Sequence, residues 1–158
     1  MRFLQFPTIT VVTLGCFLIS CVPSQNLAST PTGSPTPTTL TVTIESPKQG
    51  ETIKEPAFDM RGKYVGEIPN GYKLWVLIKD QYNYFMAYPP PSVAIPTKSW
   101  SQRNVRLGSL GSWELHVCLA NKAASQWLED RAKKGIWAGF PSLPEGIKTV
   151  KYIKVNRI

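Results

Sequence analysis

The sequence predicts a mainly β fold, with two packed sheets and a single helix inserted before the last strand. Three observations carry this prediction: a continuous apolar run at residues 73–79, a strictly alternating stretch at 113–119, and turn-forming Gly, Pro and Asn between the apolar segments. Short runs rich in β-branched and aromatic residues favour strands over helices. The chain has 158 residues, which is room for one such domain with extensions.

The run at 73–79 is expected to be the central strand of the fold. It reads Lys-Leu-Trp-Val-Leu-Ile-Lys, with five consecutive apolar residues between two lysines. A strand with this pattern is covered on both faces. Alternation then assigns its side chains to two faces, with Trp75 and Leu77 on one and Leu74, Val76 and Ile78 on the other.

Further strands are expected on either side of this run. In chain order they cover residues 40–44, 58–64, 82–87, 104–107, 113–119 and 148–157. The stretch at 113–119 reads as a half-buried strand, because its odd positions are apolar while Glu114, His116 and Cys118 share the other face. In the last strand, the alternation slips between Tyr152 and Ile153, which predicts a β-bulge.

One helix is expected between the last two strands. Asn121 suits the N-cap, the helical pattern runs to about Lys134, and Gly135 is a suitable stop. Ala124, Leu128 and Ala132 fall on one helix face and are expected to pack on the sheet.

The number and spacing of these elements indicate an immunoglobulin-like sandwich at residues 40–158. The domain resembles a family of immunoglobulin-like modules found in secreted and lipid-anchored bacterial proteins. The motifs that carry this resemblance are Ser46-Pro47-x-x-Gly50, Gly62, Pro69-x-Gly71-Tyr72-x-Leu74-Trp75-Val76, Gly111-Ser112-Trp113, Leu119-Ala120 and Leu143-Pro144-x-Gly146. They are structural motifs, so the resemblance implies a fold and not an activity. The domain holds a single cysteine, so the inter-sheet cystine of antibody domains is absent and Trp75 is expected to pack on aliphatic neighbours.

The first 39 residues predict the subcellular location of the protein. Residues 1–20 suit a signal peptide, and Leu18-Ile19-Ser20-Cys21 resembles the lipobox of bacterial lipoproteins. That resemblance implies lipidation of Cys21 and anchoring of the protein to the extracytoplasmic side of a bacterial membrane. Residues 21–39 are uncharged and rich in Pro, Ser and Thr, which predicts a disordered tether. Three alternatives stay open: a weaker lipobox ending at Cys16, an ordinary secretory signal, and an uncleaved anchor.

Two groups of residues are candidates for ligand binding. The aromatic group consists of Tyr82, Tyr84, Phe85 and Tyr88, whose rings suit a sugar face or a proline-rich peptide if they are exposed. The alternative is that half of them alternate into the core. The basic group consists of Lys148, Lys151, Lys154 and Arg157, with Arg131, Lys133 and Lys134 as further candidates, and suits acidic polymers or lipid headgroups. Its alternative is an ordinary solvated edge.

These features favour a non-catalytic binding or assembly module of the cell envelope. The excess of Lys and Arg (18) over Asp and Glu (10) favours anionic partners. The predicted extracytoplasmic location argues against nucleic acid as the partner. Glu114, His116 and Cys118 offer the rival hypothesis of a small enzyme or metal protein. Their alternative is an outward strand face with Cys118 covered by the helix. The sequence indicates no fourth ligand for a metal and no residue that would orient a catalytic histidine, so we expect no cofactor and no metal. A third hypothesis is an accessory subunit whose partner supplies the activity.

Overall fold

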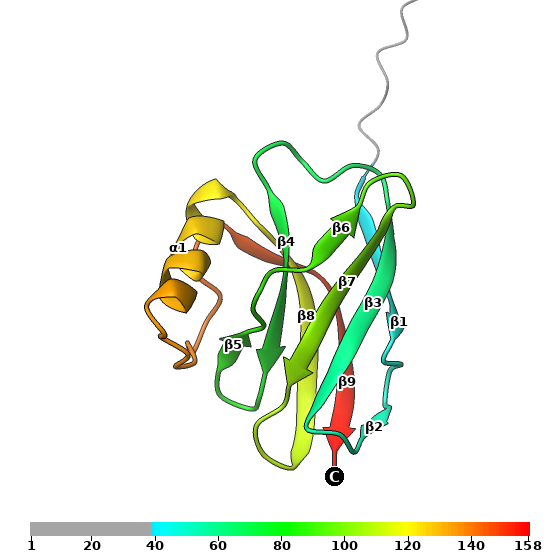
Figure 1. Ribbon diagram of the computed structural model, residues 1–158, viewed down its shortest axis with the longest axis vertical. Coiled ribbons are helices and arrows are strands. Elements are labelled where there is room, and N and C mark those ends of the chain that lie inside the picture. The colour runs from blue at the N-terminus through cyan, green and yellow to red at the C-terminus, as the bar shows by residue number, and fades with distance from the viewer. Residues whose placement is uncertain (1–38) are drawn as a thin grey trace, which may run out of the picture. The chain divides into compact units, whose positions relative to one another are not determined.

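The computed structural model describes residues 39–158, which form two sheets packed face to face and one helix (Figure 1). The first sheet has the order β1-β3-β7-β6, and the second has the order β2-β9-β8-β4-β5. The first sheet contains β1 (Thr41–Ser46), β3 (Ala57–Val65), β6 (Ser92–Ala94) and β7 (Ser99–Arg106). The second contains β2 (Thr52–Ile53), β4 (Lys73–Lys79), β5 (Tyr84–Met86), β8 (Gly111–Ala120) and β9 (Ile147–Arg157). The helix α1 (Lys122–Lys133) lies between β8 and β9 in the sequence.

The strand order is that of an immunoglobulin-like sandwich. Immunoglobulin domains pair strands A, B, E and D in one sheet and G, F and C, with C′ where present, in the other. Assigning β1, β3, β6 and β7 to A, B, D and E reproduces the first sheet. Assigning β4, β5, β8 and β9 to C, C′, F and G reproduces the second, with the short β2 added in parallel to β9. The predicted fold class is therefore confirmed, including the helix before the last strand.

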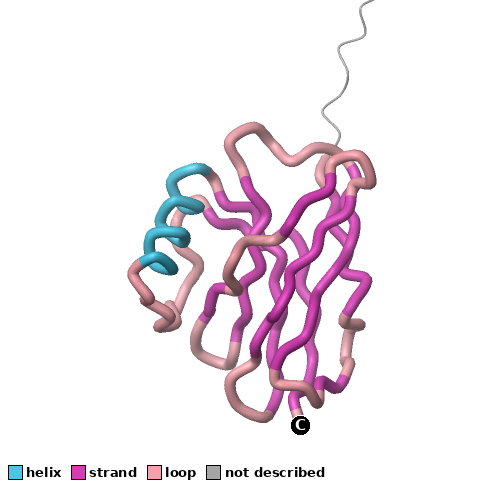
Figure 2. Tube along the Cα trace, viewed as in Figure 1, coloured by secondary structure: helices cyan, strands magenta, loops and turns pink. Residues whose placement is uncertain are grey.

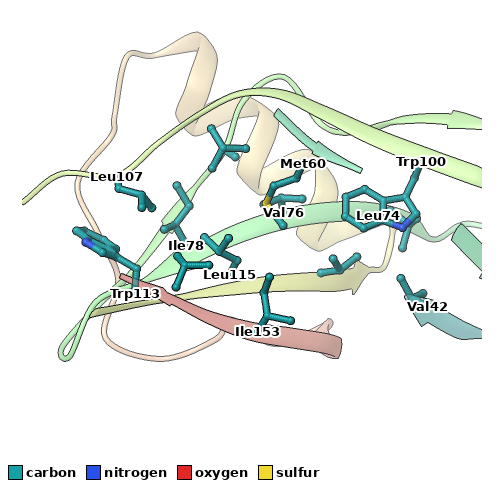
Figure 3. Packing of buried hydrophobic residues seen from close by; sticks show 14 of the residues in the cluster. Val42, Met60, Leu74, Val76, Ile78, Trp100, Leu107, Trp113, Leu115 and Ile153 are labelled. Carbon is teal, nitrogen blue, oxygen red and sulfur yellow. The ribbon is translucent and has the colours of Figure 1, made fainter. Parts of the chain in front are cut away.

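The main core lies between the two sheets. Figure 3 shows Leu74, Val76 and Ile78 of β4 pointing into it. Met60 and Trp100, from the other sheet, complete the same cluster. The side chains of β4 that were assigned to this face all lie here, which confirms the predicted alternation. Burial of each large apolar side chain contributes about 1.5–3 kcal/mol to folding.

A second core lies between the second sheet and the helix. Trp75 and Leu77 of β4 are fully buried here against Ala124 and Leu128 of α1. The indole Nε1 of Trp75 donates a hydrogen bond to Ser125 Oγ at 3.2 Å. Trp75 therefore lies on the outer face of its sheet, and not between the sheets like the core Trp of antibody domains. Figure 2 shows the helix and its following loop beside this sheet.

The helix has the ends that the sequence predicts. The side chain of Asn121 accepts a hydrogen bond from the Ala124 amide at 2.9 Å, which caps the first turn. Arg131 and Lys133 lie in the last turn, where positive charge is favourable. Gly135 follows with a φ of 68°, a conformation that ends helices and that glycine adopts without strain. Within residues 39–158, no helix is long and apolar enough to cross a membrane.

Four expectations about the strands were wrong. β8 is not half-buried, because His116 and Cys118 are covered on the helix side of the sheet. β7 begins at Ser99 and not at 104, because the polar Gln102 is buried and hides the alternation. The bulge in β9 falls at Val150: Val117 pairs with Lys151 and Cys118 with Thr149, which leaves Val150 unpaired. The strands β2 and β6 were not predicted, because two or three residues carry no periodicity.

The predicted signal peptide, the lipidation site Cys21 and the tether up to residue 38 lie outside the described residues.

Candidate ligand-binding pocket

A pocket with a volume of about 550 Å³ opens at one side of the sandwich, between β5 and the second half of β7. The strand β6 pairs only with residues 99–101 of β7, so the rest of β7 has no strand on that side. Most of the lining is apolar. We call this site the aromatic pocket, and its lining consists of Ile78, Phe85, Met86, Ala87, Tyr88, Asn104, Arg106, Gly108, Trp113 and Trp137.

Four aromatic rings dominate the pocket. Trp137 is 53% exposed and Tyr88 is 41% exposed, and their ring centroids lie 6.2 Å apart at an angle of 60°. Trp113 is buried deeper, and its Nε1 donates a hydrogen bond to the Ser109 carbonyl at 3.0 Å. Phe85 lies 6.3 Å from Trp113 between ring centroids. Two rings are thus open to solvent while the other two are held by the fold.

The loop after the helix is tied down immediately after Trp137. Phe140 and Tyr84 exchange two backbone hydrogen bonds of 2.9 Å, which extend the β5 edge of the sheet. The guanidinium of Arg131 donates to the Ala138 carbonyl at 2.5 Å. A Cβ at Gly139 would lie 2.8 Å from Asn83 Cβ and Phe85 Cε1, so the glycine permits the close approach of the loop. These contacts position Trp137 without using its own side chain.

Two polar side chains face the aromatic rings across the pocket. Arg106 Nε donates a hydrogen bond to Asn104 Oδ1 at 3.3 Å. Asn104 has a positive φ of 54°, which is uncommon for a residue other than glycine. Its backbone amide donates to the Asp59 carboxylate at 3.0 Å, which holds this conformation. The register between β3 and β7 is irregular at this point, and both residues line the pocket.

The predicted aromatic group is divided by the fold. Phe85 and Tyr88 line the aromatic pocket. Tyr84 points to the opposite face of the sheet, where its ring packs 5.3 Å from His116 and 6.1 Å from Phe140. Tyr82 is 69% exposed and does not line the pocket. Half of the group therefore lies together at one site.

Four pocket residues were not predicted from the sequence: Trp113, Trp137, Asn104 and Arg106. Trp113 appeared only as part of a buried face, and Asn104 and Arg106 only as part of a short strand. Trp137 carried a usable signal, because it is a tryptophan in a glycine-containing stretch outside any predicted element. The convergence of all four depends on tertiary structure.

The predicted basic group does not form one surface. Lys151 lies opposite Val117 and Lys154 opposite Glu114, and these partners point to different faces of β8. Lys154 forms an ion pair with Glu114 at 3.4 Å. Arg157 donates hydrogen bonds to the carbonyls of Leu107 and Gly108. Among the further candidates, Arg131 stacks on Trp127 at 4.9 Å and supports the loop, while Lys133, Lys134 and Lys148 are exposed.

Glu114, His116 and Cys118 share one face of β8, as predicted, but they form a structural network. His116 Nε2 lies 3.1 Å from Glu114 Oε2, and its Nδ1 lies 3.1 Å from Thr149 Oγ1. Tyr152 stacks on the imidazole at 5.2 Å. Burial lowers the pKa of His116, although the Glu114 carboxylate opposes this shift. Burial also acts to raise the pKa of Glu114, but its hydrogen bond with His116 and the charge of Lys79 lower that pKa overall.

The thiol of Cys118 is fully buried on the helix side of its sheet. Burial raises the pKa of its thiol to about 12, and the contact with Thr149 Oγ1 at 3.6 Å offsets this only in part. The thiolate, which is the reactive form, is therefore scarce at neutral pH. Among residues 39–158, no three His, Cys, Asp or Glu side chains are grouped so that they could hold a metal ion.

We expect the free energy of unfolding to decrease above pH 9, and to decrease less in a Cys118→Ala variant. The thiol ionises from its ordinary value of 9.0 in the unfolded chain but only at about 12 in the folded protein. The stability that is present below pH 9.0 is therefore lost as the pH rises toward 12. At pH 10 the two proteins should differ by about 1.4 kcal/mol in this loss. Urea unfolding at pH 8 and pH 10 measures it, and equal losses would contradict a buried, protonated thiol.

Comparisons with known proteins add a fold-level likeness only. No protein-family model and no curated protein sequence matches this chain. Among solved structures, that of murine CRIg aligns with 76% of this chain and 98% of its own, at 10% sequence identity and a TM-score of 0.29. A likeness of this size carries no argument, so the assignment of the immunoglobulin-like sandwich rests on the strand order itself.

Proposed function

We propose that this protein is a non-catalytic, lipid-anchored binding module on the extracytoplasmic side of a bacterial membrane, and that it binds its ligand in the aromatic pocket. The observation that carries the proposal is the pair of solvent-open rings, Trp137 and Tyr88, above an apolar pocket floor. Concave, mostly apolar sites with a few converging polar groups are typical of small-ligand pockets. Its volume of about 550 Å³ lies within the usual range for such sites.

A carbohydrate of the cell envelope is the ligand class that this chemistry favours. Sugar rings present apolar C–H faces that stack on aromatic rings, together with hydroxyls that need hydrogen-bonding partners. Trp137 and Tyr88 offer the ring faces, and Asn104 and Arg106 offer polar groups. An accessory module that holds a wall polysaccharide needs no chemistry of its own.

The rival function, an enzyme or metal protein that uses His116 and Cys118, has less physical support. Both side chains are buried beneath other residues, and the thiol is protonated at neutral pH. Neither residue lines the aromatic pocket.

The anchoring part of the proposal rests on the Leu18-Ile19-Ser20-Cys21 motif and on the uncharged Pro/Ser/Thr stretch after it. Mass spectrometry of the N-terminal peptide should find an acylated Cys21 with residues 1–20 removed. An unmodified Cys21 with the leader still attached would contradict the anchor.

We expect Trp137→Ala to reduce retention on immobilised cell-wall polysaccharide about tenfold, because the variant loses the most exposed ring of the pocket. Affinity chromatography of the purified protein measures the retention. Tyr88→Ala should act in the same direction. Tyr82→Ala is the matched control, since it removes an aromatic ring that is more exposed but lies outside the pocket. Retention of the Trp137 variant equal to that of wild type would contradict the proposed site.

A further inference from the structure

We infer that the aromatic pocket selects an acidic sugar, a ring that carries a carboxylate, and that Arg106 binds the carboxylate. This inference rests on the proposed function and specifies its ligand. Three features of the pocket support it: the charges around it, the hydrogen bonds of Arg106, and the aromatic rings that line it with Arg106.

The charge at the pocket is positive and lacks an internal counter-ion. Arg106 is the only charged side chain among the described residues that line the pocket, and no Asp or Glu lines it. None of the ion pairs found within residues 39–158 involves Arg106. A second cation lies nearby, because Arg157 donates hydrogen bonds to the carbonyl of Gly108, a lining residue. A ligand with a negative group is therefore electrostatically complementary to this site.

Arg106 is held in a geometry that leaves donors available. Its Nε is engaged by Asn104 Oδ1 at 3.3 Å. Asn104 is itself locked by the bond from its backbone amide to the Asp59 carboxylate at 3.0 Å. Asp59 thus bonds to the backbone and not to the guanidinium. The two terminal nitrogens of Arg106 form no hydrogen bond within the described residues, and a planar guanidinium binds a carboxylate through two parallel bonds.

The aromatic rings that line the pocket with Arg106 favour a ligand whose negative group is attached to a flat, partly apolar ring. The rings of Trp137 and Tyr88 meet edge to face at an interplanar angle of 60°, and both are partly exposed. Trp113 lies beneath them with its indole nitrogen already bonded to the Ser109 carbonyl, so it presents only apolar surface to the pocket. A free inorganic anion would leave this apolar surface wet, whereas a neutral sugar would gain no charge interaction with the guanidinium of Arg106, which is exposed to solvent. An acidic sugar ring satisfies both parts of the site.

The test uses oligosaccharides of glucuronate, galacturonate and mannuronate, each compared with its neutral methyl ester. Methyl esterification keeps the ring and removes the charge. We expect at least one acid to bind about tenfold more tightly than its ester, the factor that a charge-assisted pair supplies. Arg106→Gln should abolish that difference, while Arg106→Lys should keep part of it. Isothermal titration of the purified protein measures the affinities, and thermal melting confirms that both variants are folded.

Several outcomes would overturn the inference. Equal affinity for acid and ester would do so, and so would an acid preference that survives in Arg106→Gln. Failure to bind any of the oligosaccharides, or binding of a proline-rich peptide in their place, would also do so. The proposed binding site and the proposed ligand class can be contradicted independently. If polysaccharide retention depends on Trp137 but no acid preference exists, the proposed function stands and only the role of Arg106 falls. If retention does not depend on Trp137, both fall.

Discussion

Gly62→Ala should destabilise the protein by about 3 kcal/mol or more, because the added methyl group meets atoms that cannot move away. A Cβ at position 62 would lie 1.9 Å from the backbone carbonyl of Thr43, and 2.8 Å from two ring atoms of Trp100. Thr43 belongs to β1, whose pairing with β3 fixes the carbonyl. The indole of Trp100 is fixed as well, since its Nε1 donates a hydrogen bond to that same carbonyl at 3.2 Å.

Urea unfolding of the wild type and the variant measures this loss. Gly108→Ala is the matched control, because its new Cβ would lie 3.4 Å from Trp113 at the nearest, within ordinary contact distance. We expect the control to change the free energy of unfolding by less than about 1 kcal/mol. A Gly62→Ala protein as stable as the control would show that β1 and β3 can separate at this point, contrary to the packing of Trp100 described above.

The fold was predictable where a strand carries a complete local pattern. The bounds of β4 follow from five apolar residues between two lysines, and its two faces follow from alternation alone. The helix was predictable because Asn121 and Gly135 mark its two ends. Prediction failed where the environment of a residue depends on distant segments. Gln102 is buried despite its polar side chain, and His116 is buried on a face of β8 that its alternation marks as polar.

The candidate site was predictable only in part, because a pocket is a property of tertiary contacts. Phe85 and Tyr88 were in the predicted aromatic group since several aromatic residues lie close together in that stretch. Alternation sends their neighbour Tyr84 to the other face of the sheet. Trp137 reaches the pocket from about fifty residues later through the bridge between Phe140 and Tyr84, a pairing outside any regular strand. The sequence contains no local signal for such a pairing.

The predicted basic group shows the same limit for charges. The four basic residues were grouped because they lie in one segment, but Lys151 lies opposite Val117 and Lys154 opposite Glu114, and these two partners point to different faces of β8. Lys154 and Arg157 then form specific contacts, with Glu114 and with two backbone carbonyls. The number of positive charges therefore describes only the chain as a whole. Among the basic residues discussed above, all within residues 39–158, Arg106 lines the aromatic pocket and Arg157 donates a hydrogen bond to the lining residue Gly108.

Trp75→Ala should have the second large effect, a loss of about 3–5 kcal/mol, which is the usual cost of truncating a fully buried aromatic side chain. A domain of this size has only about 5–15 kcal/mol of stability in total, so the variant should melt at a much lower temperature.

The loss at Trp75 has two components that a second variant separates. Ser125→Ala removes the hydrogen bond from Trp75 Nε1 to Ser125 Oγ and the bond from Ser125 Oγ to the Ala120 carbonyl, but it leaves the indole in place. It should cost about 1–3 kcal/mol. The rest of the loss in the free energy of unfolding of Trp75→Ala then measures the packing between β4 and the helix. Because this packing holds α1, and α1 carries the Arg131 side chain that bonds to the Trp137 loop, we expect Trp75→Ala to weaken polysaccharide retention even below its melting temperature. Unchanged retention in a destabilised but folded variant would show that the loop keeps its position without the helix.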